Sequence, residues 1–148
     1  MPNTDSSEVV ANYIYTMMKG VAETFSPEQI QDVFYGDQVL LPKTPAICVV
    51  PGVKQREFQG ASLRVLNIFE TLIYVYYCKI QDVQQNTHGC VALADAIEKF
   101  VHADFTLGGN VFSIICEQSE PGIATKSGDL MMAARLLFRS QSKTMLLP

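Results

Sequence analysis

Residues able to perform acid–base, nucleophilic or metal chemistry are few in this chain and lie far apart. The two histidines, His88 and His102, are separated by 14 positions, which does not suggest a shared metal ion. The four cysteines include no C-x-x-C pair, and three of them lie in apolar segments, so buried free thiols are expected ahead of disulfides or a metal site. No G-x-S-x-G or P-loop motif occurs, and none of the fifteen acidic residues is singled out for general acid–base work. The sequence therefore predicts no enzyme, no cofactor and no metal.

Two arginines near the C-terminus are the most informative charged residues. Arg135 and Arg139 lie four positions apart in the apolar run LMMAARLLFRSQSK, where a buried, unpaired guanidinium would be costly. In a strand this even separation places both on one face, and the opposite face is then uniformly apolar and faces the core. Arginine is enriched at interfaces, so the arginine face is predicted to contact another subunit; the alternative is an outer sheet face whose arginines reach into solvent. The candidate subunit interface comprises Arg135, Arg139, Met131 and Leu137, and the core-facing set is Met132, Ala134, Leu136 and Phe138.

A polar, turn-rich stretch, PGVKQREFQG, is the second candidate for a contact surface. It places Lys54, Gln55, Arg56 and Glu57 directly before Phe58. A long loop with mixed charge and one exposed aromatic side chain is typical of a docking element. The alternative is the ordinary tip of a hairpin whose arms pair with each other.

Nucleic-acid binding has weak support in this sequence. Tyr74, Tyr76, Tyr77 and Phe112 resemble a base-stacking platform, but only Lys79 supplies a nearby positive charge. The net charge of −4 also argues against binding by bulk electrostatics. Core packing is therefore the favoured interpretation of these aromatic residues.

The charge is unevenly distributed along the chain. Residues 121–148 carry four basic side chains and one acidic one, so this segment has a charge of +3 and residues 1–120 have −7. An acidic body with a basic C-terminal segment suits head-to-tail association of identical subunits, although scattered solvated charges would look the same. Hydrophobic residues make up 48% of the chain against 18% charged residues, which also favours some apolar surface covered by another subunit. No apolar run approaches the ~20 residues of a membrane span, and the polar start MPNTDSSEVV is unlike a signal peptide.

Hydrophobic periodicity predicts two main helices. The first covers about residues 6–24, with Asp5 as its cap and Glu8 reaching back in a capping box. The second lies within QQNTHGCVALADAIEKFVHAD, with Thr87 as its cap. A short further helical segment is expected to begin at Ser26 and Pro27 and to end at YGDQ.

The remaining elements are strands. They are expected over residues 46–50, 71–80, 111–118 and 130–143. Residues 51–70 are expected to form a long excursion whose arms can pair as a hairpin, and residues 119–129 a loop. The segment TLIYVYYCKI is apolar on both faces, which predicts that both faces of the sheet are covered. The predicted fold is α+β: an antiparallel sheet of about four strands packed with two main helices, in the order helix, strand, loop, strand, helix, strand, strand. A single domain over residues 1–148 is expected, with its core in about residues 45–143 and a short tail at 144–148.

This order of elements, together with three segments, resembles a family of virus proteins. The segments TLIYVYYCKI, ALADAIEKFV and PGIATKSGDLMMAARLLFRSQSK are similar to the second half of the tail-terminator and neck proteins of tailed bacteriophages. The resemblance covers about residues 45–143 and consists of a pattern of apolar strands rather than an invariant signature.

The resemblance implies a structural protein of the virion, assembled in the host cytoplasm. Members of this family form a ring, usually a hexamer, that caps the tail tube and docks to the head connector. DNA passes through the ring without specific binding, and no catalytic residue, cofactor or membrane is involved. A head-completion or adaptor protein of the same neck is the alternative within this class. A small ligand-binding α+β domain is the alternative from a different class.

Overall fold

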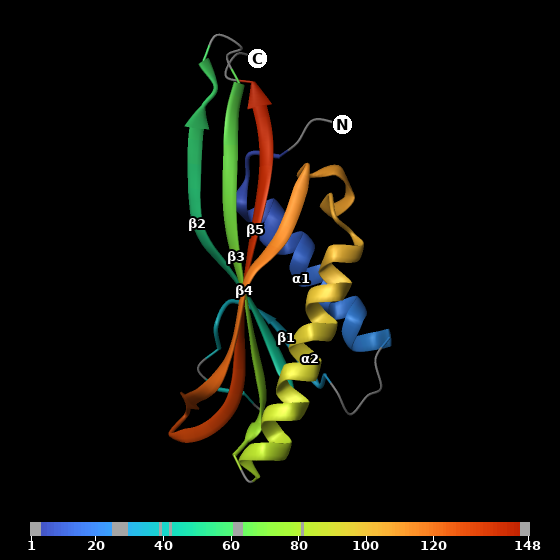
Figure 1. Ribbon diagram of the computed structural model, residues 1–148, viewed down its shortest axis with the longest axis vertical. Helices are drawn as coiled ribbons and strands as arrows, with labels where there is room; N and C mark the ends of the chain where they lie inside the picture. Colours follow the sequence, from blue (N-terminus) through green and yellow to red (C-terminus); the bar gives the residue numbers. More distant parts are fainter. Residues whose placement is uncertain are drawn as a thin grey trace.

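In its described part, the chain folds into one mixed five-stranded sheet packed with two α-helices. The computed structural model describes residues 4–24, 30–38, 40–41, 43–60, 64–80 and 82–145. The elements, shown in Figure 1, are α1 (Ser7–Thr24), β1 (Asp32–Tyr35), β2 (Ala46–Phe58), β3 (Arg64–Lys79), α2 (Val83–Ala103), the short 3₁₀ helix η2 (Leu107–Gly109), β4 (Ser113–Lys126) and β5 (Asp129–Met145). The strand order is β1-β2-β3-β5-β4, and every neighbouring pair is antiparallel except β1 and β2. The α+β prediction is confirmed, with five strands in place of about four.

The additional strand is β1, in a region where a short helix was expected. Residues 25–29, which include the expected start of that helix, lie outside the described part of the chain. Residues 32–35 instead pair in parallel with the start of β2, from Asp32 opposite Ala46 to Tyr35 opposite Val49. The sequence Asp-Val-Phe-Tyr contains β-branched and aromatic residues that fit a half-buried sheet surface, and the neighbouring strand supplies the backbone partners.

The stretch expected to be a loop after residue 50 is the outer half of a long strand. β2 continues to Phe58 and pairs with β3, with one irregularity in the register between Pro51 and Lys54. The pairing of the two arms is therefore confirmed, but the five predicted docking residues belong to a strand. The hairpin of β2 and β3 forms one end of the elongated molecule in Figure 1.

Residues 119–129 were also expected to be a loop, and most of them extend β4. β4 runs to Lys126, and a tight turn at Ser127 and Gly128, with φ of 54° and 81°, leads into β5. These positive angles are typical of a two-residue hairpin turn. Pro121 is tolerated because β4 is an edge strand, where a missing N–H need not interrupt the sheet.

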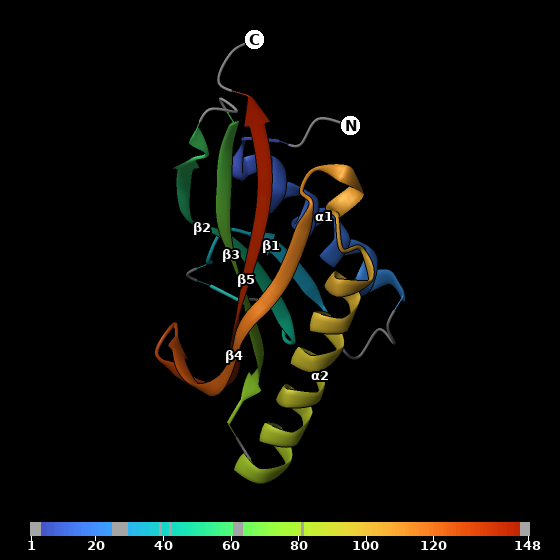
Figure 2. The same cartoon turned by 45° about the horizontal axis from the view of Figure 1, so that its top comes forward.

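Both helices lie on the same face of the sheet, as Figure 2 shows. The core between helices and sheet contains Met132, Ala134, Leu136 and Phe138, all buried, so the predicted core face of β5 is confirmed. No helix in the described part of the chain is long and apolar enough to cross a membrane.

The helix ends differ in detail from the predicted caps. The Ser6 hydroxyl, and not Asp5, accepts the Val9 N–H at the start of α1. α2 begins one turn before Thr87, where the Asp82 carboxylate accepts the Gln85 N–H at 3.2 Å. Within α2, Gly89 is needed for close packing: a Cβ there would lie 2.3 Å from the Tyr77 hydroxyl.

Candidate functional site

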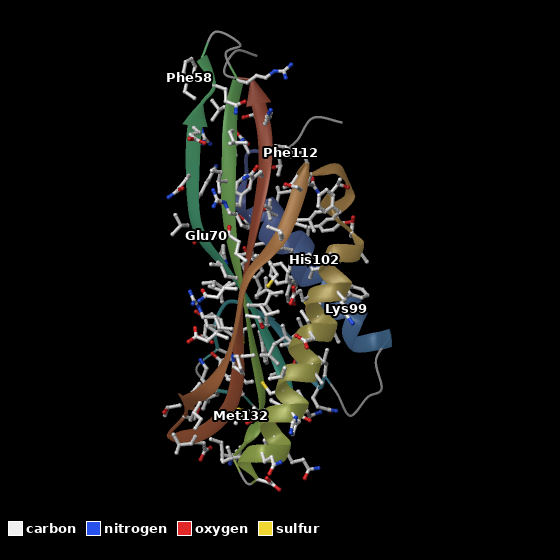
Figure 3. All side chains as sticks on the ribbon, viewed as in Figure 1. Phe58, Glu70, Lys99, His102, Phe112 and Met132 are labelled. Carbon is white, nitrogen blue, oxygen red and sulfur yellow. The ribbon has the colours of Figure 1, made fainter. Side chains whose placement is uncertain are left out.

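The face of the sheet opposite the helices, called the open face below, carries the predicted interface residues. Alternate residues of β5 from Met131 to Arg139 point to this face, because their neighbours are in the core beneath the helices. Figure 3 shows Glu70, which is directly opposite Arg139 on β3, on the side of the sheet away from both helices. Arg135 and Arg139 therefore share one face, as predicted.

Part of the open face is covered by the chain itself. A second, smaller cluster of buried residues contains Cys48, Tyr76, Met131 and Ala133. Leu41, from the segment between β1 and β2, packs against this cluster. Met131 is only 4% exposed, so it does not lie at the surface and is removed from the candidate subunit interface.

A charged cluster holds the covering segment in place. The Asp37 carboxylate accepts hydrogen bonds from the Tyr76 hydroxyl at 2.8 Å and from the Lys126 ammonium at 2.7 Å. The Lys126 Nζ also lies 4.9 Å from the centre of the Tyr76 ring. Burial, and then the bond to Asp37, raises the pKa of Tyr76 far above its usual value, so the phenol stays protonated and donates. We call Asp37, Tyr76 and Lys126 the Asp37 cluster; no pattern in the sequence indicated it, because its members are 39 to 89 positions apart.

The two arginines differ in their partners. Arg139 forms an ion pair with Glu117 on β4, with an Nη1–Oε1 distance of 3.3 Å, while its buried Nε has no hydrogen-bond partner among the described residues. Arg135 lies opposite Tyr74 on β3 and Glu120 on β4. Within the part of the chain that the structure describes, its half-exposed guanidinium has no ion pair. It borders a groove of about 240 Å³ whose wall includes the stacked rings of Tyr74 and Tyr76.

An apolar row crosses the sheet between the two arginines. Val50 on β2, Leu72 on β3 and Leu137 on β5 are consecutive partners in the register, and all three are partly exposed. Ile115 on β4, opposite Arg139, is 57% exposed. We define the open-face patch by these residues: Val50, Leu72, Ile115, Arg135, Leu137 and Arg139. The sequence indicated Leu72, the β3 residue of the patch, because both faces of TLIYVYYCKI are apolar. It did not indicate Val50 or Ile115.

The predicted docking residues lie away from this patch, toward the tip of the β2–β3 hairpin. Phe58 is 60% exposed, and Figure 3 shows it near the tip. Lys54 donates to the Asp5 carbonyl, and Arg56 approaches the Asp5 carboxylate at 3.8 Å. These two basic residues therefore hold the start of α1, whereas Gln55 and Glu57 are exposed residues that alternate with them along β2. The structure does not bring Arg135 and the docking residues together.

Histidine and cysteine side chains of the described residues make contacts within the fold. The His102 Nε2 accepts the Cys116 N–H at 2.9 Å, joining α2 to β4. All four cysteines are free, and burial raises the pKa of the Cys90 thiol to about 11. In the described residues no cluster of His, Cys, Asp or Glu could hold a metal ion.

No family model matches this chain, and no curated protein is similar to it in sequence. The open-face patch is accordingly the feature of the molecule on which a functional proposal rests.

Proposed function

We propose that this chain is an assembly subunit of a tailed bacteriophage: a ring-forming tail terminator at the head–tail junction, which caps the tail tube and docks to the head connector. The observation that supports it most directly is the open-face patch, an apolar row flanked by two arginines that no helix of the described chain covers. The family resemblance of residues 45–143 supplies the virus context.

The chemistry of the patch favours a protein partner. Aliphatic side chains in a row with arginines at both ends match the composition of interface centres, where apolar residues and arginine are enriched. Arg135 supports this most strongly, because a half-buried guanidinium without an ion pair in the described chain gains most from a carboxylate on another molecule. The acidic residues 1–120 of a second copy would provide such carboxylates.

A ring follows from the asymmetry of this contact. A basic strand meeting an acidic body is a heterologous contact, and such contacts close into rings when the rotation between neighbours permits. The net charge of −4 also suits a lumen for DNA, since a negative wall would repel the phosphates and let the duplex slide.

The proposal is tested by the state of assembly. Negative-stain images and native masses of the purified chain, alone and with tail tubes of its own phage, are expected to show a closed ring or a monomer that assembles on the tubes. A compact monomer that no tail tube recruits would contradict the proposal. A chain that binds head connectors but never tail tubes would be the head-completion or adaptor protein instead.

A further inference from the structure

A basic cavity lies beside the Asp37 cluster, at the end of the molecule that holds the β4–β5 turn. It has a volume of about 420 Å³ and is formed by the segment before β2, the end of β3 and the turn between β4 and β5. Lys43, Lys79 and Lys126 all line it, together with the hydroxyl-bearing residues Thr44 and Ser127. Three segments far apart in the sequence thus contribute lysines to the lining of one cavity of a size that small ligands occupy.

The charge of this cavity is opposite to that of the chain. Three of the seven lysines of the protein line it, against Asp129 in the lining and Asp37 paired with Lys126 beside it, which gives a local charge of +1 in a chain of −4. An anion in this cavity would find Lys43, which has no ion pair among the described residues, and the exchangeable Lys79 within one lining.

The three lysines are suited to different tasks. Lys126 is fixed by Asp37 and the Tyr76 ring, and its side chain is 14% exposed, so it is a rigid part of the lining whose charge Asp37 already offsets in part. Lys79 pairs with Asp129 at 3.2 Å, but both side chains are well exposed, and such a pair contributes little and exchanges readily. Lys43 is exposed and makes no ion pair within the described residues. Lys43 and Lys79 can therefore turn toward a ligand while Lys126 stays in place.

The rest of the lining selects among anions. Leu41 contributes apolar surface to the same cavity, and the nearly buried Met131 lies behind it in the wall. A bare inorganic anion would leave this surface unused, whereas a carboxylate on a short aliphatic chain would place its carbons there and its oxygens on the lysines. We propose that the cavity binds an aliphatic carboxylate, supplied by an acidic side chain of a partner protein or by a free dicarboxylic acid. The inference does not depend on the proposed ring.

Titration followed by backbone amide NMR tests the proposal. The probes are glutarate, a tetraglutamate peptide with an acetylated N-terminus and an amidated C-terminus, inorganic phosphate and a short oligothymidylate. We expect glutarate or the peptide to shift the amides of Lys79, Lys126 and Ser127. Lys43→Gln and Lys79→Gln should each raise the Kd of whichever carboxylate binds about fivefold or more, because each variant loses one charge-assisted contact. Neither variant changes a residue of the Asp37 cluster. The matched control is Lys99→Gln, which lies on the exposed side of α2 (Figure 3) and should leave the Kd unchanged.

The outcomes separate the sources of the carboxylate. Tighter binding of the peptide indicates a partner segment, and tighter binding of glutarate indicates a free acid. The proposal is overturned if neither carboxylate shifts these amides, if phosphate or the oligonucleotide binds as tightly as the carboxylates, or if the Lys43 and Lys79 variants bind like the Lys99 variant.

Discussion

Arg139 on β5 is paired with Glu117 on β4 at 3.3 Å, whereas Arg135, four residues earlier on the same face, has no ion pair in the described chain. Two arginines of one strand face are thus in different electrostatic situations. Arg139 has an acidic partner within the subunit, although its Nε has no hydrogen-bond partner among the described residues. Arg135 lies across from Glu120 without an ion pair in the same part of the chain, and its charge is the one available to a partner.

Replacing Arg135 with glutamate should weaken subunit association far more than it destabilises the monomer. A carboxylate there would repel an acidic partner, so we expect the association constant to fall roughly tenfold or more. The unfolding free energy should change by less than ~1 kcal/mol, because the site is partly exposed. Sedimentation velocity and urea unfolding measure the two quantities. Lys99→Glu, a charge reversal on α2, is the control for net charge. A collapse of stability with association intact would show that the faces of β5 have been assigned wrongly.

Leu136 and Leu137 are adjacent leucines on opposite faces, and they provide a matched pair. Leu136 is fully buried, so Leu136→Ala should cost ~2–5 kcal/mol of unfolding free energy. Leu137→Ala should cost less than ~1 kcal/mol in the monomer and yet weaken association, because Leu137 belongs to the open-face patch. Chemical denaturation and sedimentation of both variants check this. Equal stability losses, or an unchanged association of the Leu137 variant, would exclude the patch as an interface.

Tyr76→Phe should destabilise the monomer by ~1 kcal/mol, the usual contribution of one buried hydrogen bond. The change keeps the ring beneath Lys126 and removes only the hydroxyl that donates to Asp37. Tyr74→Phe is the control, since the Tyr74 hydroxyl makes no hydrogen bond among the described residues and its ring stacks in the same row. Thermal unfolding of the two variants should differ; identical melting would mean that the Asp37 cluster does not hold the segment between β1 and β2.

Cys90 makes the stability of the fold sensitive to alkaline pH. Burial raises the pKa of its thiol from 9.0 to about 11, so the unfolded chain releases this proton at a lower pH than the native chain does. The contribution of the protonated thiol is complete below pH 9 and is lost as the pH rises toward 11, by up to ~2 kcal/mol. Urea unfolding from pH 8 to pH 11 measures this loss, and Cys90→Ala should lose less stability over the same range. An identical pH profile in the variant would contradict this assignment.

Local patterns in the sequence predicted those helices and strands in which apolar residues recur at a regular spacing. The helical spacing of apolar residues marked α1 and α2, and the alternation in LMMAARLLFRSQSK identified the core face of β5, which Leu136 and Phe138 confirm. The same reasoning failed for β1 and for the outer parts of β2 and β4. The outer parts of β2 and β4 contain Gly, Pro and charged residues, and β1 is only four residues long; the strand conformation of all three depends on backbone partners from distant parts of the chain.

The sequence by itself determined the fold class, the two faces of β5 and the placement of both arginines on one of them, because side-chain direction in a strand depends only on residue parity. Only the tertiary structure decided which residues of that face are at the surface. Met131 is covered by the segment that Asp37 holds, Arg139 is paired with Glu117, and Arg135 is left with its charge unpaired in the described chain. Burial and ion pairing are contacts between residues that the fold brings together, so the sequence pattern of a single strand cannot predict them.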